Sequence, residues 1–389
     1  MDVSDGSPVG KLPVVPELVA IDLPGGEPFV DALQRVWDDG DAALPVDQRL
    51  PPAARAVLFE ALGPARVVGA DGRRALEGGR PVEPGDALVM ATSGTTGVPK
   101  GVVLTHDAVA ASARATSARL GVDPGRHRWL ACLPLSHVGG LSVVTRSLCT
   151  GTPCDVLPGF DAEAVRALSG PEVMVSLVAT ALQRTPADLF RTVVLGGSAP
   201  PAQLAANVVT TYGLTETGSG VVYDGLPLDG VEVDVDGASG EIRLRGPMLL
   251  RCYRDGTVPL DPDGWFATGD VGGFDGDGRL TVHGRVTDMI ISGGENIWPV
   301  PVEEVLRAHP AVAEVAVAGR PDPEWGQRVV AWVVPADPDR PPRLEELRDL
   351  VGERLARFAA PRQLVIASSL PRTSIGKIRR EELVAPEPG

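Results

Sequence analysis

The sequence predicts an α/β protein with a large N-terminal α/β domain, which includes a β subdomain, and a small C-terminal α+β domain. A chain of 389 residues is too long for one ordinary hydrophobic core, so two domains are expected. Between residues 87 and 212, short apolar runs alternate with amphipathic segments, which is typical of parallel strands connected by helices. The pattern changes after residue 231 and again after residue 285, and these changes predict the β subdomain and the second domain.

The large domain is expected to span residues 1–285. Its candidate strands are residues 129–133, 154–157, 173–177, 192–195 and 208–211. Residues 107–120 are rich in alanine and are followed by Gly121, which suits the position after a helix C-terminus, so we expect a helix there. Residues 231–250 alternate in the manner of strands and contain turn signals, which predicts the small β subdomain.

The small domain is expected to span residues 286–389. Its expected elements, in order, are a strand at 289–292, a helix at 302–308, strands at 312–318 and 328–334, and a helix at 344–355. A mixed pattern over about 100 residues is enough for a separately folded unit.

The composition excludes several classes of protein. A net charge of −15 argues against nucleic acid as a partner, because a phosphate backbone demands a basic surface.

The four cysteines match no usual zinc spacing and are expected to be reduced. Residues 1–11 are polar and acidic, unlike a signal peptide, and no apolar run approaches the length of a membrane helix. We therefore expect a cytoplasmic protein without membrane insertion.

Residues 92–101 predict a polyphosphate-binding loop directly after the apolar run at 87–91. Glycines let backbone N–H groups approach an anion closely, hydroxyl groups add donors, and a lysine adds a positive charge. The loop differs from the common P-loop because Pro99 separates the lysine from the preceding glycine. A solvated turn between two strands is the alternative interpretation. The candidate phosphate-binding residues are Thr92, Ser93, Gly94, Thr95, Thr96, Gly97 and Lys100.

Three shorter segments carry matching chemistry. Residues 212–217 follow an expected strand, and the carboxylate of Glu216 suits Mg²⁺, which prefers oxygen ligands. Residues 268–270 place Asp270 on an expected tight turn, where its carboxylate suits the hydroxyls of a ribose. Lys377 lies on a glycine-containing loop near the C-terminus. Each segment also has an ordinary interpretation: a core tyrosine with a surface glutamate, a capped turn, and a charged tail.

Taken together and in this order, the segments resemble the motifs of the adenylate-forming superfamily. Its members include acyl- and aryl-CoA ligases, the adenylation domains of peptide synthetases, and luciferases. The resemblance covers residues 87–380, and five ordered motifs make it specific. The matching segments are residues 92–101, residues 212–217, residues 268–270, Gly284-Arg285 with Asp288 and Gly293-Gly294, and residues 371–377.

The resemblance implies an enzyme that uses ATP, Mg²⁺ and coenzyme A. A substrate carboxylate would attack the α-phosphorus of ATP to give an acyl-adenylate and pyrophosphate. The thiol of coenzyme A would then displace AMP to form a thioester. The C-terminal domain of such enzymes swings between these two steps, and Lys377 leaves the site as it does so.

The resemblance also implies roles for single residues. Lys377 would bridge the substrate carboxylate and the α-phosphate, and Glu216 would hold Mg²⁺ beside the phosphates. Tyr212 would stack on adenine, Asp270 would hold the ribose hydroxyls, and Arg285 would lie near the ribose. The further candidates are Gly196, Gly197, Ser198, Gly213 and Thr215 around the nucleotide, of which Thr215 is also a catalytic candidate, and Gly293 and Gly294 beside the thiol channel.

Residues 133–141 bear on the choice of acid. His137 follows an expected strand and is a catalytic and substrate-binding candidate that could gate the acyl pocket or orient the carboxylate, although a histidine satisfied in a turn is the alternative. Together with residues 146–148 and 222–230, this block resembles the o-succinylbenzoate–CoA ligases of menaquinone biosynthesis. Their substrate carries a second, aromatic carboxylate, and Arg146 is the candidate partner for that group.

Other functions stay open at this point. The chain could be another aryl- or acyl-CoA synthetase, an adenylation module that loads a carrier protein, or a nucleotide-binding regulatory protein that has lost its chemistry. The sequence does not determine the oligomeric state, and a homodimer is compatible with it.

Two features depart from the family pattern. Only 91 residues precede the phosphate loop, where family members usually have well over a hundred, so the N-terminal region is expected to be shortened. Thr287 occupies the hinge position that is usually Asp or Lys, and the neighbouring Asp288 could share its role.

Overall fold

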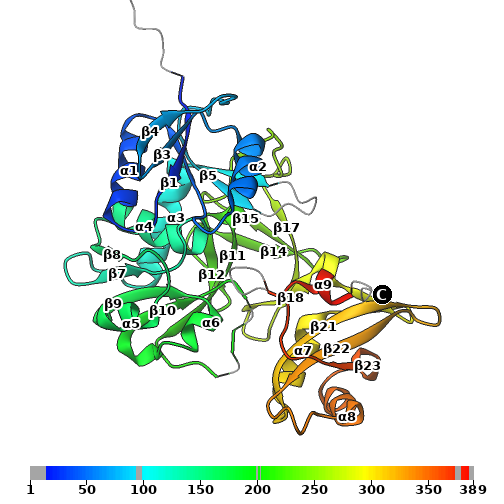
Figure 1. The fold of residues 1–389 in the computed structure, drawn as a ribbon. Helices are drawn as coiled ribbons and strands as arrows, with labels where there is room; N and C mark the ends of the chain where they lie inside the picture. The colour runs from blue at the N-terminus through cyan, green and yellow to red at the C-terminus, as the bar shows by residue number, and fades with distance from the viewer. Residues whose placement is uncertain (1–14, 93–98, 199, 202, 373–377, 385–389) are drawn as a thin grey trace, which may run out of the picture.

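The structure is a computed structural model that describes residues 15–92, 99–198, 200–201, 203–372 and 378–384. Within these ranges the strands form four sheets, of seven, seven, four and five strands. Figure 1 shows the chain running from the first sheets to a separate group of elements around β21 (Val312–Asp322) and β22 (Gly326–Pro335) near the C-terminus. No helix in the described part is long and apolar enough to cross a membrane.

The first sheet contains most of the strands that precede residue 106. Its strands, in spatial order, are β16 (Cys252–Tyr253), β6 (Lys100–Thr105), β5 (Asp86–Thr92), β2 (Ala42–Pro45), β1 (Leu18–Asp22), β3 (Arg66–Gly69) and β4 (Gly72–Ala75). The four inner strands β5, β2, β1 and β3 are parallel, β6 and β4 run antiparallel to them, and β16 pairs antiparallel with β6. The phosphate loop therefore connects β5 to its antiparallel neighbour β6.

The second sheet contains the strands that were expected between residues 129 and 211. Its order is β13 (Leu226–Pro227), β12 (Ser219–Tyr223), β11 (Val208–Leu214), β10 (Phe190–Leu195), β9 (Gly170–Leu177), β7 (Arg128–Ala131) and β8 (Cys154–Val156). From β8 to β11 the strands are parallel, and β12 and β13 continue the sheet in antiparallel fashion. The expectation of a largely parallel sheet is confirmed.

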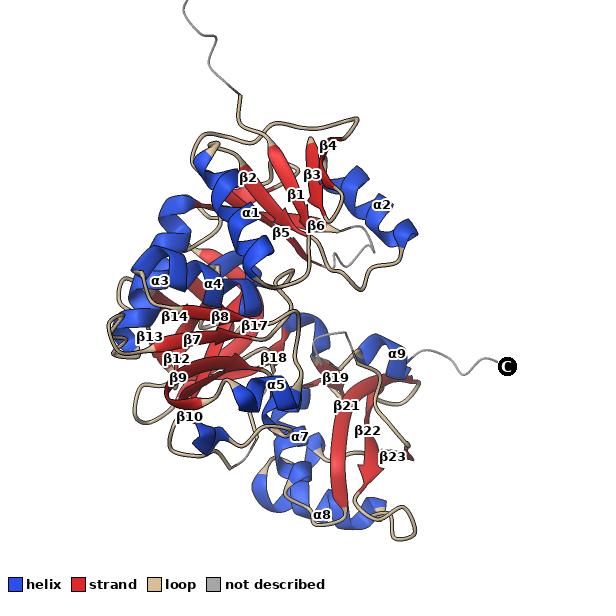
Figure 2. Ribbon diagram, turned by 60° about the vertical axis from the view of Figure 1, so that its left-hand side comes forward, coloured by secondary structure: helices blue, strands red, loops and turns tan. Residues whose placement is uncertain are grey.

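Helices α3 and α4 lie between the two large sheets, as Figure 1 and Figure 2 show. Their buried residues belong to one core that also contains Val19 of the first sheet and Trp129 of the second. The opposite faces of the sheets are covered by α2 and by α5 with α6. The bounds in this region are α1 (Glu27–Asp38), α2 (Pro52–Leu62), α3 (His106–Arg119), α4 (Val138–Thr150), α5 (Ala162–Ala167), α6 (Ala179–Leu182), and the 3₁₀ turns η1 (Ala187–Leu189) and η2 (Thr215–Thr217).

The expected helix after β6 is confirmed as α3. Its start is capped by Thr105, whose side-chain oxygen accepts a hydrogen bond from the backbone N–H of Ala108 at 3.1 Å. It ends before Gly121, which has a positive φ of 59° and so takes a conformation that glycine adopts without strain.

The β subdomain is an antiparallel sheet of β14 (Glu232–Val235), β15 (Glu241–Arg245), β17 (Phe266–Phe274) and β18 (Leu280–Arg285). Strand β17 is irregular opposite β15, because Ala267 pairs with Arg243 while Val271 already pairs with Glu241. The extra residues of β17 form a bulge that contains the 268–270 motif. A bulge of this kind bends a strand and re-aims its side chains.

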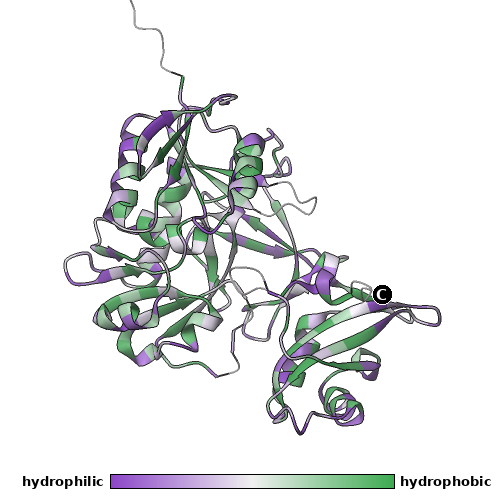
Figure 3. Ribbon diagram, in the orientation of Figure 1, coloured by the Kyte–Doolittle hydropathy of each residue, from purple (hydrophilic) through white to green (hydrophobic). Residues whose placement is uncertain are grey.

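The C-terminal elements form a mixed sheet in the order β20, β19, β22 and β21, with β23 parallel to β22. Figure 3 shows hydrophobic stretches along β21 and β22. In order along the chain, the elements are η3 (Val286–Asp288), β19 (Ile290–Ser292), β20 (Glu295–Ile297), α7 (Pro299–Arg307), β21 (Val312–Asp322), β22 (Gly326–Pro335), α8 (Leu344–Arg354), η4 (Arg357–Ala359), β23 (Gln363–Ile366) and α9 (Arg380–Val384).

The hydrophobic clusters divide along the same line. Among the described residues, no hydrophobic cluster combines buried side chains from before Leu280 with buried side chains from after Ile290. Separate cores are what a division into a large and a small domain requires. The exact boundary between residues 285 and 286 stays a prediction.

We expect the two glycines at the start of α4 to respond differently to alanine. A Cβ at Gly140 would lie 2.4 Å from the carbonyl oxygen of Pro134, whereas a Cβ at Gly139 would meet no atom within 4 Å. Gly140→Ala should therefore lower the free energy of unfolding by about 1–3 kcal/mol through overpacking. Gly139→Ala, the matched control, should leave stability unchanged or raise it slightly, since alanine favours a helix. Denaturant unfolding of both variants checks this, and equal losses would contradict it.

Candidate active site

Three predicted nucleotide-binding residues meet at one carboxylate. The hydroxyl of Tyr212 donates to Oδ2 of Asp270 at 2.8 Å, and Nε of Arg285 lies 2.8 Å from Oδ1 of the same side chain. The Asp270 side chain is 11% exposed and that of Arg285 is 50% exposed. The three residues lie far apart in the sequence and come from β11, β17 and β18, so tertiary structure brings them together.

Strand register explains the position of Asp270. It lies opposite Arg285 in the β17–β18 pair, and cross-strand neighbours of opposite charge attract each other. Gly269, the preceding residue, has a φ of +72°, which a side chain would disfavour. The hydroxyl of Thr268 accepts from the backbone N–H of Asp270 at 3.0 Å and so supports the bulge.

The protonation state of Tyr212 follows from its surroundings. Burial, reinforced by the neighbouring Asp270 carboxylate, raises the pKa of Tyr212 above its ordinary value. The phenol therefore stays a hydrogen-bond donor at neutral pH, which the carboxylate of Asp270 requires. The ring of Tyr212 is consequently held in place from its hydroxyl end.

A second cluster joins the end of the phosphate loop to Glu216. The hydroxyl of Tyr253 donates to Oε1 of Glu216 at 3.0 Å, and Nζ of Lys100 lies 5.2 Å from the centre of the Tyr253 ring. Burial and the Glu216 carboxylate raise the pKa of Tyr253, so this hydroxyl also stays a donor. The phosphate-loop lysine and the predicted metal ligand are thus neighbours through one aromatic ring.

The donor set around Glu216 fits Mg²⁺. The described residues contain no group of three or more Asp, Glu, His or Cys side chains that could hold a metal by themselves. Mg²⁺ is commonly held by one or two carboxylates together with water and the phosphates of a nucleotide. A single carboxylate fixed by Tyr253, close to a lysine that would contact phosphates, suits that arrangement.

The backbone around the nucleotide residues is tightly packed at two glycines. A Cβ at Gly196 would lie 2.7 Å from Oγ1 of Thr211, and one at Gly213 would lie 2.1 Å from the carbonyl oxygen of Ser219. Gly197 has a φ of +86°, as a sharp turn after β10 requires. Ser198 lies three residues after the end of β10, and Thr215 directly follows the end of β11.

His137 lies immediately before α4 and contacts the N-terminal region. Its Nε2 is 3.3 Å from Nη2 of Arg49 and 3.8 Å from Oδ2 of Asp47. Asp47 and Arg49 also pair with each other at 2.7 Å, and that hydrogen bond lowers the pKa of Asp47. The histidine is therefore placed by polar partners that follow β2, and not merely by a local turn.

Arg146 is buried in the layer between α4 and the second sheet. It is 2% exposed, its Nη2 donates to Oγ of Ser219 at 2.6 Å, and its guanidinium lies 5.3 Å from the centre of the Trp129 ring. Within the described part of the chain, its Nε and Nη1 have no hydrogen-bond partner. Burial lowers the pKa of Arg146, in keeping with the absence of a carboxylate partner among the described residues.

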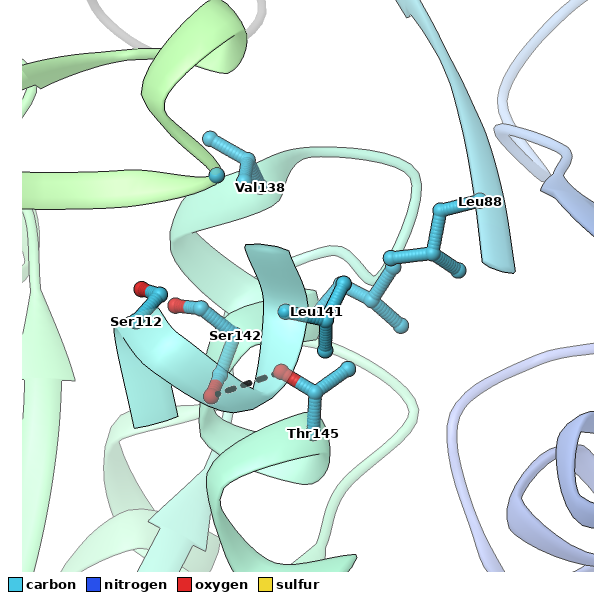
Figure 4. A pocket seen from close by; sticks show the side chains of 8 residues that line it. Leu88, Ser112, Val138, Leu141, Ser142 and Thr145 are labelled. Atoms are coloured by element: carbon cyan, nitrogen blue, oxygen red, sulfur yellow. Dashed lines mark hydrogen bonds between the residues drawn. The ribbon is translucent and has the colours of Figure 1, made fainter. Parts of the chain in front are cut away.

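A small polar cavity lies beside Ser142, one helical turn before Arg146 in α4. Figure 4 shows Ser112 of α3 facing Ser142 and Thr145 of α4, with Leu88 and Leu141 on the apolar side. Ser142 also accepts a hydrogen bond from the Ser219 hydroxyl at 3.2 Å, which links this cavity to Arg146. The cavity volume of about 10 Å³ suits one water molecule and not an organic acid.

Several predicted residues lie outside the described part of the chain. They are Ser93, Gly94, Thr95, Thr96 and Gly97 of the phosphate loop, and Lys377. Thr92 and Lys100, which flank the loop, are described and pair across β5 and β6. Gly293 and Gly294 form the two-residue turn between β19 and β20, and both have a positive φ, as such hairpins require.

Two details of the sequence interpretation were wrong. Asp270 does not sit on a tight turn but in the bulge of β17, because β15 and β18 pair with that strand on both sides. The 212–217 motif does not follow a strand but begins inside it, since antiparallel pairing with β12 extends β11 to Leu214. In both cases pairing with neighbouring strands outweighed the local glycine signal.

The sequence interpretation also missed residues of the site. Tyr253, which holds Glu216, and Arg49 with Asp47, which hold His137, belong to no motif. The only signal for Asp47 and Arg49 is their place just beyond the carboxyl end of a parallel strand, where ligand sites of α/β sheets tend to lie.

Two family descriptions match the chain. The first, AMP-binding enzyme, covers residues 73–254, and the second, AMP-binding enzyme C-terminal domain, covers residues 301–377. A protein from Mycobacterium tuberculosis described as a probable 2-succinylbenzoate–CoA ligase is 40% identical over 397 residues, which cover 94% of this chain and 97% of the relative. A 2-succinylbenzoate–CoA ligase from Listeria monocytogenes is 36% identical and is matched over 76% of this chain and 69% of its own length.

Solved structures of similar fold carry the same kind of description as these relatives. The o-succinylbenzoate CoA synthetase (MenE) from Bacillus subtilis, in complex with the acyl-adenylate intermediate OSB-AMP, superimposes with a TM-score of 0.81 at 29% identity over 97% of this chain and 90% of that chain. The same enzyme in complex with ATP and a magnesium ion gives a TM-score of 0.80 at 29% identity, over 95% and 90% of the two chains.

We expect Tyr212→Phe to weaken the binding of ATP while leaving the ring in place. The change removes one hydrogen bond to Asp270, and a hydrogen bond of this kind contributes about 1 kcal/mol, so the KM for ATP should rise about fivefold. Steady-state kinetics at varied ATP check this result. A KM equal to that of the unaltered protein would mean that Asp270 is positioned by Arg285 alone.

Proposed function

The chain belongs to the AMP-binding enzyme family, and on that premise we propose that it is a 2-succinylbenzoate–CoA ligase of menaquinone biosynthesis. The enzyme is an AMP-forming acid–thiol ligase that acts on a small carboxylic acid with ATP and coenzyme A. The observation that carries the choice of acid is the 40% identity to a probable 2-succinylbenzoate–CoA ligase over nearly the whole of both chains.

The first half-reaction has an electrostatic problem that the site addresses. One carboxylate oxygen of the acid attacks the α-phosphorus of ATP, and the bond to the leaving pyrophosphate breaks. Two anions must therefore approach each other, which requires preorganised positive charge and hydrogen-bond donors. Lys100, at the end of the phosphate loop, supplies charge to the phosphates, and Glu216 would hold Mg²⁺, which neutralises phosphate charge when bound.

The nucleotide is oriented by the Asp270 cluster. Its carboxylate already accepts from Tyr212 and faces Arg285, and a carboxylate has about four lone-pair positions, so it can also accept from the ribose hydroxyls. The ring of Tyr212 is held in a fixed orientation against which adenine can stack. Arg285 pairs with Asp270 through Nε and is half exposed, so the rest of its guanidinium can approach the ribose side of the nucleotide.

The second half-reaction forms the thioester. The sulfur of coenzyme A attacks the acyl carbon of the adenylate, and AMP leaves with the electron pair of the broken bond. The turn at Gly293 and Gly294 would border the thiol arm on its Gly294 side, because a Cβ at Gly294 would meet no atom within 4 Å, whereas one at Gly293 would lie 2.9 Å from the ring of Trp325. Lys377 is assigned to the first half-reaction only, where it would bridge the substrate carboxylate and the α-phosphate.

Recognition of the acid is assigned to α4. A buried cation without a carboxylate partner is costly, so an anionic ligand group would stabilise Arg146. The aromatic carboxylate of 2-succinylbenzoate supplies such a group, while the succinyl carboxylate reacts. Because the Arg146 side chain is only 2% exposed, α4 or its neighbours would have to move for the acid to reach it.

The setting of the enzyme follows from the same considerations. We place it in the cytoplasm, where ATP and coenzyme A are available and where its four cysteines would stay reduced. Small molecules are its partners, and a homodimer stays a prediction.

A comparison of activities with three carboxylic acids tests this function directly. Pyrophosphate release is measured with ATP and 2-succinylbenzoate, with benzoate, and with a fatty acid, and thioester formation is then measured after adding coenzyme A. We expect release and thioester formation with 2-succinylbenzoate to exceed those with the monoacids by orders of magnitude. A preference for benzoate or fatty acids would overturn the choice of acid and leave the ligase chemistry standing.

We expect Lys377→Ala to suppress the first half-reaction by about 10²-fold or more, because the lysine would stabilise charge that develops in the transition state. Thioester formation from acyl-adenylate made beforehand should change little. Pyrophosphate release without coenzyme A and thioester formation from the added adenylate are measured separately. Equal losses in both would contradict the role of Lys377.

Arg146→Met is expected to reduce discrimination between acids. Methionine fills much of the same volume without a charge, so the dicarboxylate should lose activity while the analogue without the aromatic carboxylate should not. A site built for a polar partner rejects such an analogue by about 10⁴-fold when it is fully desolvated. The measurement is kcat/KM for both acids with both proteins, after thermal unfolding has shown that the variant is folded. An equal loss for both acids would assign Arg146 to the fold and not to recognition.

A further inference from the structure

One partly buried guanidinium in the C-terminal region, 20% exposed, connects four separate elements. Arg380, the first residue of α9, donates from Nη2 to Oε1 of Glu303 in α7 at 2.6 Å and from Nη1 to Oδ2 of Asp288 at 3.2 Å. Its Nε donates to the carbonyl oxygen of Val317 in β21 at 3.1 Å. Each nitrogen of the guanidinium therefore has an acceptor, and the acceptors come from η3, α7 and β21.

Glu303 makes this network rigid. Its side chain is 2% exposed, and the same oxygen that binds Arg380 also accepts from the backbone N–H of Val317 at 2.8 Å. The side chain of Arg307 lies 3.5 Å from the other oxygen. A buried carboxylate with several charge-assisted partners has little freedom to reorient, so it fixes Arg380 in turn.

The network lies at the base of the segment that carries Lys377. Arg372 and Ile378 pair with each other on either side of that segment, and the backbone N–H of Arg379 donates to the carbonyl oxygen of Pro371 at 2.9 Å. Arg372 is anchored to Glu314 of β21 at 2.6 Å. Arg380 anchors the other side of the same base, three residues after Lys377 in the sequence.

Asp288 connects the network to the segment that follows the hinge candidate. Asp288 is the last residue of η3 and directly follows the hinge candidate Thr287. Its carboxylate is bound to Arg380, so Asp288 is held together with α7, β21 and α9. Any turning of the chain must then occur before Asp288, at residues 285–287.

We propose that Arg380 is a positioning residue for Lys377. With one guanidinium it binds Asp288, Glu303 and β21, and it thereby holds the base of the lysine-bearing segment at a fixed place relative to the residue that follows the hinge candidate. Lysine could not replace it, because a single ammonium group cannot direct a planar fork of donors at three acceptors. This inference rests on the proposed function, in which Lys377 acts in the first half-reaction.

The experiment separates positioning from mere stability. The variants are Asp288→Asn, Arg380→Met, the two combined, and Lys377→Ala as a reference. Arg379→Met is the matched control, because Arg379 is 46% exposed and pairs with the surface residue Glu382. For each protein the thermal midpoint, the KM for ATP, the rate of pyrophosphate release without coenzyme A, and thioester formation from added acyl-adenylate are measured.

Asp288→Asn is the most informative variant, because it leaves the Glu303–Arg380 pair intact. We expect pyrophosphate release to fall about tenfold or more, since a small misplacement of a catalytic group is costly. The KM for ATP and the thermal midpoint should stay close to those of the unaltered protein, since a partly exposed pair adds little stability. Arg380→Met should lose at least as much, and adding Asp288→Asn to it should cause no further loss.

Several outcomes would overturn the inference. One is unaltered pyrophosphate release in Asp288→Asn. Another is a loss of release in the double variant that equals the product of the two single losses. A third is a loss in Arg379→Met equal to that in Arg380→Met. If Arg380→Met does not fold, Asp288→Asn alone decides between the outcomes. A normal rate in Lys377→Ala would remove both the role of Lys377 and this inference, whereas a loss there with a normal Asp288→Asn would remove the inference alone.

Discussion

The nucleotide side of the site depends on the carboxylate of Asp270 and on the need of a largely buried charge for partners. The hydroxyl of Tyr212 reaches it from the second sheet, and Arg285 reaches it from the last strand of the β subdomain. The same contact that would present acceptors to a ribose therefore also fixes one sheet against another. Arg285 is the last residue before η3, so this contact also fixes the point from which the C-terminal elements extend.

Two arginines, the buried Arg146 and the partly buried Arg380, illustrate opposite uses of the same side chain. Arg380 has an acceptor for each guanidinium nitrogen, including a buried carboxylate, and such a fully satisfied network specifies one geometry. Arg146 contacts one serine hydroxyl and the face of a tryptophan, and two of its nitrogens find no partner among the residues that the structure describes. An unsatisfied cation of this kind is costly for the isolated protein, and a matching anion would recover that cost on binding. The first arrangement suits a structural anchor and the second suits recognition.

The protein is strongly acidic overall and yet its function requires it to bind anions. The structure reconciles these properties by local placement of cations: Lys100 lies over Tyr253 at the end of the phosphate loop, Arg285 lies beside Asp270, and Arg49 lies beside His137. Interactions beyond a Debye length are screened, so the charge within about 10 Å of a phosphate matters more than the net charge of the chain.

The sequence by itself determined the order of strands and helices and the chemistry of the motifs. Alternation of apolar runs with amphipathic segments gave the strands of the second sheet and helix α3, because strand and helix periodicity are local properties. It also predicted Asp270, Tyr212 and Glu216 as site residues, because their segments, taken together and in order, resemble the motifs of the adenylate-forming superfamily. Only the tertiary structure decided that Asp270 lies in a bulge and that Tyr212 lies within a strand. It also decided that Tyr253 contacts Glu216, that Arg49 contacts His137, and that Arg380 contacts Asp288. Those features arise from strand pairing and from contacts between residues distant in the sequence, and no local pattern encodes them.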